Sequence, residues 1–130
     1  MSAQGLQQQR VGQRGSVLRR RLWLGVFAIL ALAHLAALYW PRVSVEGPVV
    51  WSDKVVHVLL FALPAAAGLL AGLRPAYLLV PLALHAPVSE ALQHFVLPNR
   101  SGDPWDAVAD LSGVVVGATV VMVGSMRSRW

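Results

Sequence analysis

The sequence predicts an all-α membrane protein: a four-transmembrane-helix bundle with the N- and C-termini in the cytoplasm. Hydrophobic residues make up 56% of the 130 residues and charged residues only 13%, with a mean hydropathy of +0.58. Soluble domains carry about 25% charged residues. The apolar residues also gather into runs of roughly 20, the length that crosses a bilayer as a helix. A single domain of this size could not bury so much apolar surface in water, so the expected partner is the lipid bilayer.

Composition also excludes several classes of function. The net charge is +5 and the isoelectric point is near 11.1, a balance that often indicates nucleic-acid binding. Here the basic residues stand at the ends of the apolar runs and not along one face, so they are better explained as a topology signal, and no nucleic-acid partner is expected. The chain has no cysteine, which excludes disulfides, thiolate catalysis and cysteine-ligated zinc.

The first 40 residues combine a polar and an apolar segment. Residues 1–21 are rich in Gln, Gly and Arg without apolar periodicity, which predicts a disordered, basic cytoplasmic tail. Residues 22–40 follow as the first transmembrane helix. A cleaved signal peptide is the competing interpretation, but the apolar run is long for such a peptide and no clear cleavage site follows. His34, deep in this helix, is expected to be neutral and hydrogen-bonded within the bundle.

Breaks at Pro, Gly and polar residues divide the rest of the chain into three more helices. The expected helices are 22–40, 53–73, 76–96 and 105–124 in a membrane domain of 22–126, followed by a cytoplasmic tail at 127–130. Pro64 frees a backbone carbonyl that a neighbouring helix must cover. Pro81 and Pro87 are expected to kink the third helix. Gly113 and Gly117 give the fourth helix a small-residue face suited to close helix packing.

The distribution of basic residues predicts the orientation. With the N-terminus inside, eight of the 11 Lys and Arg residues lie on the cytoplasmic side, and Arg42, Lys54 and Arg100 lie outside. The reverse orientation would invert this ratio, against the rule that cytoplasmic loops carry the positive charge.

With this topology, ionisable residues of three helices fall at one depth. At the rise of 1.5 Å per residue, His57, Glu90 and Asp110 lie about 6, 9 and 8 Å from the outer ends of their helices. Three pairs are spaced by four residues and so share a helix face: Asp53 and His57, Glu90 and His94, and Asp106 and Asp110. Because such groups tend to face a bundle interior or a wet cavity, we expect a water-accessible polar pocket that opens outward. Its expected lining is Asp53, His57, Glu90, Gln93, Asp106 and Asp110, with Arg100 folding over it from a loop.

Three motifs run in order from Asp53 to Gly117, half of the chain. They are Asp53-Lys54-x-x-His57-x-x-x-Phe61, Ser89-Glu90-x-x-Gln93-x-Phe95-x-x-Pro98-x-Arg100 and Asp106-x-x-x-Asp110-x-x-Gly113-x-x-x-Gly117. Together they resemble the motifs of the VanZ-like family of bacterial multi-pass membrane proteins. The resemblance implies a small plasma-membrane protein with a role in the cell envelope, since the family's namesake is linked to resistance to the glycopeptide antibiotic teicoplanin. The family pattern usually has Asn where this chain has Asp110, which adds a negative charge, so the ligand preference of relatives does not carry over to this chain.

Two functional interpretations stay open beside a structural one. In the first, the pocket binds a lipid-linked cell-wall precursor or a glycopeptide-related ligand without catalysis, and the Arg100 guanidinium could hold a phosphate. In the structural one, the polar groups only hydrogen-bond across helices and fix the bundle. Neither requires a resident cofactor or metal, and none is expected. The oligomeric state is left open.

The other functional interpretation is an intramembrane enzyme. Its candidate catalytic residues are His57, Glu90 and Asp110, with Asp106 as a further carboxylate, and they would act as acid and base. Metal-assisted hydrolysis, with His94 as an extra ligand, is a variant of this interpretation. The sequence contains no serine elbow, no His-Glu-x-x-His zinc motif and no phosphate-binding loop.

Overall fold

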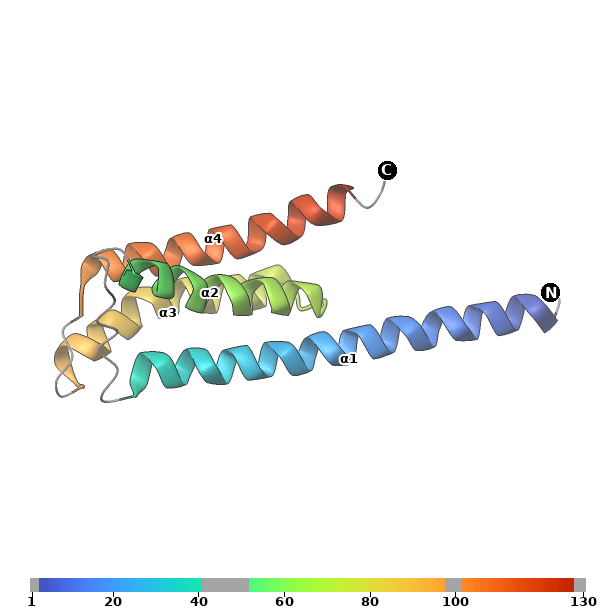
Figure 1. Cartoon of the computed structure of the whole chain (residues 1–130), viewed down its shortest axis with the longest axis horizontal. Coiled ribbons are helices and arrows are strands. Elements are labelled where there is room, and N and C mark those ends of the chain that lie inside the picture. The colour runs from blue at the N-terminus through green and yellow to red at the C-terminus, as the bar shows by residue number, and fades with distance from the viewer. Residues whose placement is uncertain (1–2, 41–51, 98–101, 128–130) are drawn as a thin grey trace.

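The computed structural model describes residues 3–40, 52–97 and 102–127 (Figure 1). Within these ranges the chain forms four α-helices and no strand: α1 (Ala3–Tyr39), α2 (Ser52–Leu70), α3 (Pro75–Phe95) and α4 (Pro104–Arg127). The all-helical prediction is therefore confirmed. Three helices, α1, α2 and α4, are long and apolar enough to cross a membrane. The second half of α3 carries His85, Glu90, Gln93 and His94, and these polar residues lower its hydropathy.

The first helix corrects the expectation of a disordered tail at 1–21, because α1 begins at Ala3 and runs for 37 residues. Its polar half is rich in Gln and Arg, which are good helix formers. The apolar half that follows supplies formed turns, so the polar half extends a helix without the cost of nucleating one. A helix of this length spans about 55 Å, against about 30 Å for the hydrocarbon core of a bilayer. The N-terminal part of α1 accordingly projects past the other helices in Figure 1.

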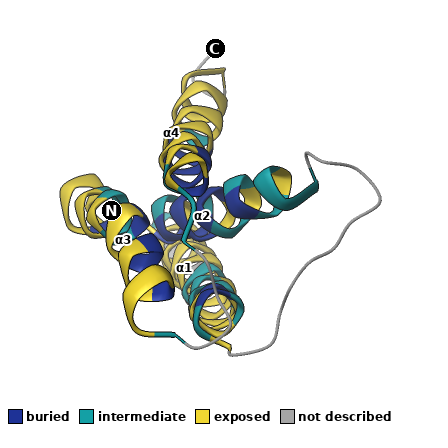
Figure 2. Ribbon diagram, turned by 90° about the vertical axis from the view of Figure 1, so that its left-hand side faces the viewer, coloured by how far each residue is buried: buried dark blue, intermediate teal, exposed yellow. Residues whose placement is uncertain are grey.

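The centre of the bundle is α2. It contacts each of the other three helices, while α1 and α4 lie on opposite sides of it and do not contact each other within the described residues (Figure 2). One cluster of buried apolar side chains takes one residue from each helix: Leu38, Phe61, Ala86 and Val114. Most of the other buried apolar residues are alanines, so polar contacts between helices also help to fix the arrangement.

The contact between α2 and α4 is unusually close. A Cβ atom added at Gly113 would lie 2.3 Å from the carbonyl oxygen of Val58, and one added at Gly117 would lie 2.3 Å from that of Ala62. Both glycines therefore pack directly on the backbone of α2, as small residues do between membrane helices. The two contacts advance together along both chains, so α2 and α4 run in the same direction and their polar N-terminal ends lie at the same end of the bundle.

The turn between α2 and α3 is longer than the expected Arg74-Pro75. Helix α2 ends at Leu70, and the N–H of Leu73 donates to the carbonyl of Gly68 at 3.0 Å. Gly72 adopts a φ of 77°, a left-handed conformation that glycine takes without a Cβ penalty and that commonly closes a helix. Pro75 then opens α3, which continues as one helix through Pro81 and Pro87.

Burial follows a pattern opposite to that of a soluble protein. Large apolar side chains such as Ile29, Leu32 and Val120 are more than half exposed on the outer faces of their helices, while His34 and Asp110 are buried inside. Soluble domains almost never bury single charged groups in this way while exposing rows of apolar ones. The arrangement suits lipid as the solvent around the helices.

Candidate functional site

The polar groups meet at the end of the bundle where α2 and α4 begin and α3 ends (Figure 1). We use the name polar cluster for seven residues joined there by hydrogen bonds and ion pairs: Asp53, Lys54, His57, Glu90, Asp103, Asp106 and Asp110. Five of them had been predicted from the sequence as one lining. Lys54 and Asp103 had not been assigned to the site.

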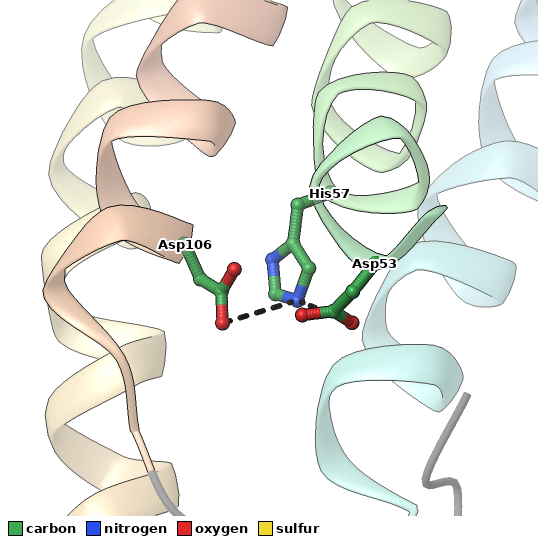
Figure 3. Close-up of side chains that lie close together, drawn as sticks. All are labelled: Asp53, His57 and Asp106. Atoms are coloured by element: carbon green, nitrogen blue, oxygen red, sulfur yellow. Dashed lines mark ion pairs between the residues drawn. The ribbon is translucent and has the colours of Figure 1, made fainter. Parts of the chain in front are cut away.

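His57 lies at the centre of the polar cluster (Figure 3). Its Nδ1 lies 2.9 Å from Oδ1 of Asp110, within hydrogen-bonding distance, and 3.9 Å from Oε1 of Glu90. Its Nε2 lies 3.9 Å from Oδ1 of Asp53 and 3.9 Å from Oδ2 of Asp106. Each ring nitrogen thus faces two carboxylates, an inner pair from α3 and α4 and an outer pair from α2 and α4.

Lys54 forms ion pairs with the carboxylates on the outer side of the polar cluster. Its Nζ donates to Oδ2 of Asp103 at 2.7 Å and to Oδ1 of Asp106, and it lies 3.7 Å from Oδ2 of Asp53. The hydrogen bond from this ammonium group, with one from the backbone N–H of Trp105, holds the pKa of Asp103 below its ordinary value of 3.8. From the sequence, Lys54 was expected only as one of the basic residues on the outer side of the membrane. Nothing in its local sequence identifies its partners, which lie 49 and 52 residues away.

Asp103 joins the loop to the site. Its Oδ1 accepts a hydrogen bond from the N–H of Trp105 at 2.9 Å, and its own backbone N–H donates to Oε2 of Glu90 at 3.0 Å. A Cβ at Gly102 would lie 2.2 Å from the carbonyl oxygen of Glu90, so only glycine lets the loop approach α3 this closely. A signal for Asp103 was present in the sequence, because Asp followed by Pro is typical of a helix N-cap and first residue.

Two buried carboxylate oxygens lack hydrogen bonds. Oε1 of Glu90 and Oδ2 of Asp110 have no hydrogen-bond partner among the described residues. Glu90 is 6% exposed and Asp110 is fully buried. Buried carboxylate oxygens are normally satisfied, and leaving one without a partner costs roughly 1–3 kcal/mol. The inner side of the polar cluster is therefore chemically incomplete.

Of the other residues predicted from the sequence, His94 lies outside the polar cluster. His94 is exposed and stacks edge-on against Phe95, with ring centroids 4.6 Å apart, so the structure does not bring it to the cluster. Gln93 is buried one turn after Glu90. Arg100 lies outside the described residues. The outward-opening pocket stays a prediction. The polar cluster has an exposed edge, formed by the side chains of Asp53 and Asp103, which are 44% and 41% exposed.

A second polar network crosses the bundle beside the ring of Phe61. Nδ1 of His34 lies 2.9 Å from the carbonyl oxygen of Leu60, Nε2 of His34 lies 3.0 Å from Nδ1 of His85, and Nε2 of His85 lies 2.7 Å from the hydroxyl of Tyr39. Since a carbonyl only accepts, His34 carries its proton on Nδ1. His85 then donates to His34, and the Tyr39 hydroxyl donates to His85, so both imidazoles are neutral and satisfied.

This network explains how Pro64 is tolerated. Proline has no N–H, so the carbonyl of Leu60, four residues earlier, loses its helical donor. His34 of α1 supplies the missing donor. Beside the two histidines lies a mostly apolar cleft of about 380 Å³ between α1, α2 and α3. A neutral His34 and a neighbouring helix that covers the carbonyl freed by Pro64 were both predicted from the sequence. That His34 itself covers this carbonyl, and that His85 and Tyr39 belong to the same network, was not predicted.

Replacing Lys54 by Met is expected to lower the stability of the bundle by about 1–2 kcal/mol at neutral pH, between the values for exposed and buried ion pairs. The folded-state pKa of Asp103 is depressed, so its contribution is present above the unfolded pKa and is lost as the pH falls through the folded pKa. The difference in melting temperature between wild type and Lys54→Met should therefore shrink as the pH falls below the ordinary pKa of 3.8. Lys54→Arg, which keeps the charge, is the control. A difference that is the same at all pH values would show that Lys54 contributes packing alone.

The chain matches no protein-family model, no curated protein and no solved structure.

Proposed function

We propose that this chain is a VanZ-like, multi-pass protein of the bacterial plasma membrane that binds the headgroup of a lipid-linked cell-wall precursor at its polar cluster. In this proposal all four helices cross the bilayer, α3 included, and both termini are cytoplasmic. The asymmetry of basic residues supports this orientation. The polar cluster then lies at the outer leaflet, where such precursors are used and where glycopeptide antibiotics act on them.

The observation that carries the proposal is the pair of buried carboxylate oxygens without hydrogen-bond donors, Oε1 of Glu90 and Oδ2 of Asp110. Carboxylates accept hydrogen bonds from hydroxyl, amide and ammonium groups, which are abundant in a saccharide–peptide headgroup. A bare diphosphate would be repelled by the same carboxylates. The polar cluster therefore suits the sugar or peptide part of the precursor, and Arg100 is the residue proposed for its phosphate.

The resemblance supports the same site. The charged and histidine residues of the second-helix and fourth-helix motifs, with Glu90 of the third, are members of the polar cluster. Gly113 and Gly117, the glycines of the fourth-helix motif, hold α4 against α2. The charged and histidine residues of the motifs thus form the polar cluster, and the two glycines allow the close packing of the helices on which most of the cluster lies.

The test is photo-crosslinking of the purified protein in lipid nanodiscs with a photoactivatable polyprenyl-diphosphate saccharide. We expect saturable labelling near Glu90 in wild type. Loss of a hydrogen bond to a charged group costs about 1.5–3 kcal/mol. At the same probe concentration, labelling of Asp110→Asn should therefore be lower than that of wild type by at least roughly tenfold. Ser112→Ala is the matched control, because Ser112 is exposed on the same helix and its hydroxyl donates to the backbone carbonyl of Val108. Equal labelling of Asp110→Asn and Ser112→Ala, with both variants folded, would contradict headgroup binding.

A second candidate function, an intramembrane hydrolase, is favoured by one observation. Asp110 orients His57 through a 2.9 Å hydrogen bond, which is the arrangement of a histidine base held by a carboxylate. His57 could then activate a water for attack on the headgroup. Conversion of the saccharide probe during the same experiment, absent in Asp110→Asn, would indicate turnover. Quantitative recovery of unchanged probe would favour simple binding.

A further inference from the structure

The inner side of the polar cluster brings three potential metal ligands together from three helices. One ligand atom each of His57, Glu90 and Asp110 lies within 4.8 Å of the others, and all three residues are buried. From this group we infer a divalent transition-metal site, in which Nδ1 of His57 and the carboxylates of Glu90 and Asp110 bind Mn²⁺, Fe²⁺ or Zn²⁺. The inference rests on the geometry and charge of these residues and does not require the proposed lipid binding.

The distances between the ligand atoms fit one ion. Two atoms bound at about 2.1 Å to the same ion stand about 3.0 Å apart at a right angle and about 4.2 Å apart on opposite sides. Nδ1 of His57 lies 2.9 Å from Oδ1 of Asp110 and 3.9 Å from Oε1 of Glu90. An ion can therefore replace the proton on Nδ1 with only small side-chain movements.

The unsatisfied oxygens lie in this group. Oε1 of Glu90, which faces His57, and Oδ2 of Asp110 have no hydrogen-bond partner among the described residues. In a buried site an acceptor without a donor is unfavourable, and a cation supplies what is missing. The observation is independent of the distances, because a purely structural ion pair would be expected to satisfy both oxygens of each carboxylate.

Charge distinguishes the inner group from the outer one. Asp53, His57 and Asp106 also lie within 4.8 Å of one another. However, the ammonium of Lys54 binds Asp106 and lies 3.7 Å from Asp53, so it already compensates this pair and would repel an added cation. Among the described residues, neither Glu90 nor Asp110 forms an ion pair with a lysine or an arginine. Two carboxylates with a neutral imidazole match the charge of one divalent ion.

The surroundings are those of a metal-binding histidine. Such a histidine usually directs its other ring N–H to a carboxylate, which fixes its orientation. With an ion on Nδ1, the proton of His57 moves to Nε2, which faces Asp53 and Asp106 at 3.9 Å each. The backbone N–H of Asp103 holds the other oxygen of Glu90 at 3.0 Å.

The ligand set also selects the kind of ion. Imidazole favours Zn²⁺, Fe²⁺ and related ions, whereas carboxylates suit Mn²⁺ and the harder ions, so a mixed set indicates first-row transition metals over Ca²⁺ or Mg²⁺. The exposed carboxylates of Asp53 and Asp103 at the end of the bundle would attract the ion from solution towards the buried group.

The test uses the full chain in detergent, from which a chelator has first removed any bound metal. The protein is then titrated with Mn²⁺, and binding is monitored by electron paramagnetic resonance. We expect one bound Mn²⁺ per chain, displaced by Zn²⁺. Glu90→Gln and Asp110→Asn should each weaken binding by at least about 10–100-fold, the size of effect seen even for residues that only support a ligand. His94→Gln, a histidine of α3 outside the cluster, should bind as wild type does. Substoichiometric binding by wild type would overturn the inference.

Pulsed electron paramagnetic resonance on the wild-type protein tests the site even if a variant fails to fold. Mn²⁺ held by His57 must show the nitrogen coupling of one imidazole, and His94→Gln must retain it. Stoichiometric binding without this coupling would overturn the inference. So would a pattern in which Asp53→Asn abolishes binding and Glu90→Gln does not, since the ion would then lie in the outer group. Because no precursor is present, failure of lipid labelling leaves these results unaffected.

Discussion

Gly113→Ala is expected to destabilise the bundle strongly, although alanine is a better helix former than glycine. The added Cβ would lie 2.3 Å from the carbonyl oxygen of Val58 and 3.0 Å from Cβ of Phe61. The first contact is with backbone, which cannot move aside like a flexible side chain. Overpacking costs typically 1–3 kcal/mol and occasionally more, and we expect at least about 3 kcal/mol here because α4 must separate from α2. Thermal unfolding in detergent and accumulation in membranes would measure the loss.

Gly124→Ala is the matched control on the same helix. No atom lies within 4 Å of a Cβ at that position, so the substitution should leave stability unchanged or raise it by up to about 1 kcal/mol through helix propensity. If Gly113→Ala and Gly124→Ala melt at the same temperature, the close approach of α2 and α4 is wrong.

His34→Leu is expected to lower stability by about 2–4 kcal/mol, since it leaves the buried carbonyl of Leu60 and one nitrogen of His85 without partners at roughly 1–3 kcal/mol each. The effect should depend on Pro64. In a Pro64→Ala background the new N–H can bond to the carbonyl of Leu60, so His34→Leu should cost at least about 1 kcal/mol less. Unfolding of all four proteins of this double-mutant cycle would measure the coupling.

Leu35→Ala controls for substitution in the same turn of α1. Leu35 is 46% exposed and has no part in the network, so its effect should be small and independent of Pro64. Strict additivity between His34→Leu and Pro64→Ala would mean that His34 does not replace the lost helical donor.

The sequence predicts well what depends on local spacing. Long apolar runs identified the helices, and the four-residue spacing of Asp53 with His57 and of Asp106 with Asp110 identified faces that do meet. His94 shows the limit of that rule. A spacing of four leaves about 40° between two side chains, and His94 lies in the last turn of α3, where it is exposed while Glu90 is buried.

What depends on contacts between distant segments was not predictable. Lys54 and Asp103 are paired although they are 49 residues apart, and His34 and His85 although they are 51 residues apart. No periodicity in the local sequence of these residues predicts such a pairing. The polar half of α1 was missed for a different reason. Its composition resembles that of disordered segments, and its helix is an extension of the apolar helix that follows it.

The parallel packing of α2 and α4 has a consequence for biogenesis. These two closely packed helices are not neighbours along the chain, because α3 is synthesised between them. Before α4 is synthesised, His57 and Glu90 still lack Asp106 and Asp110, and Lys54 lacks two of its three carboxylates. Helix α4 thus completes the charge balance of the helices made before it. A nascent chain truncated before α4 should be recognised by membrane quality control as unassembled, even though its first helices are apolar enough to insert.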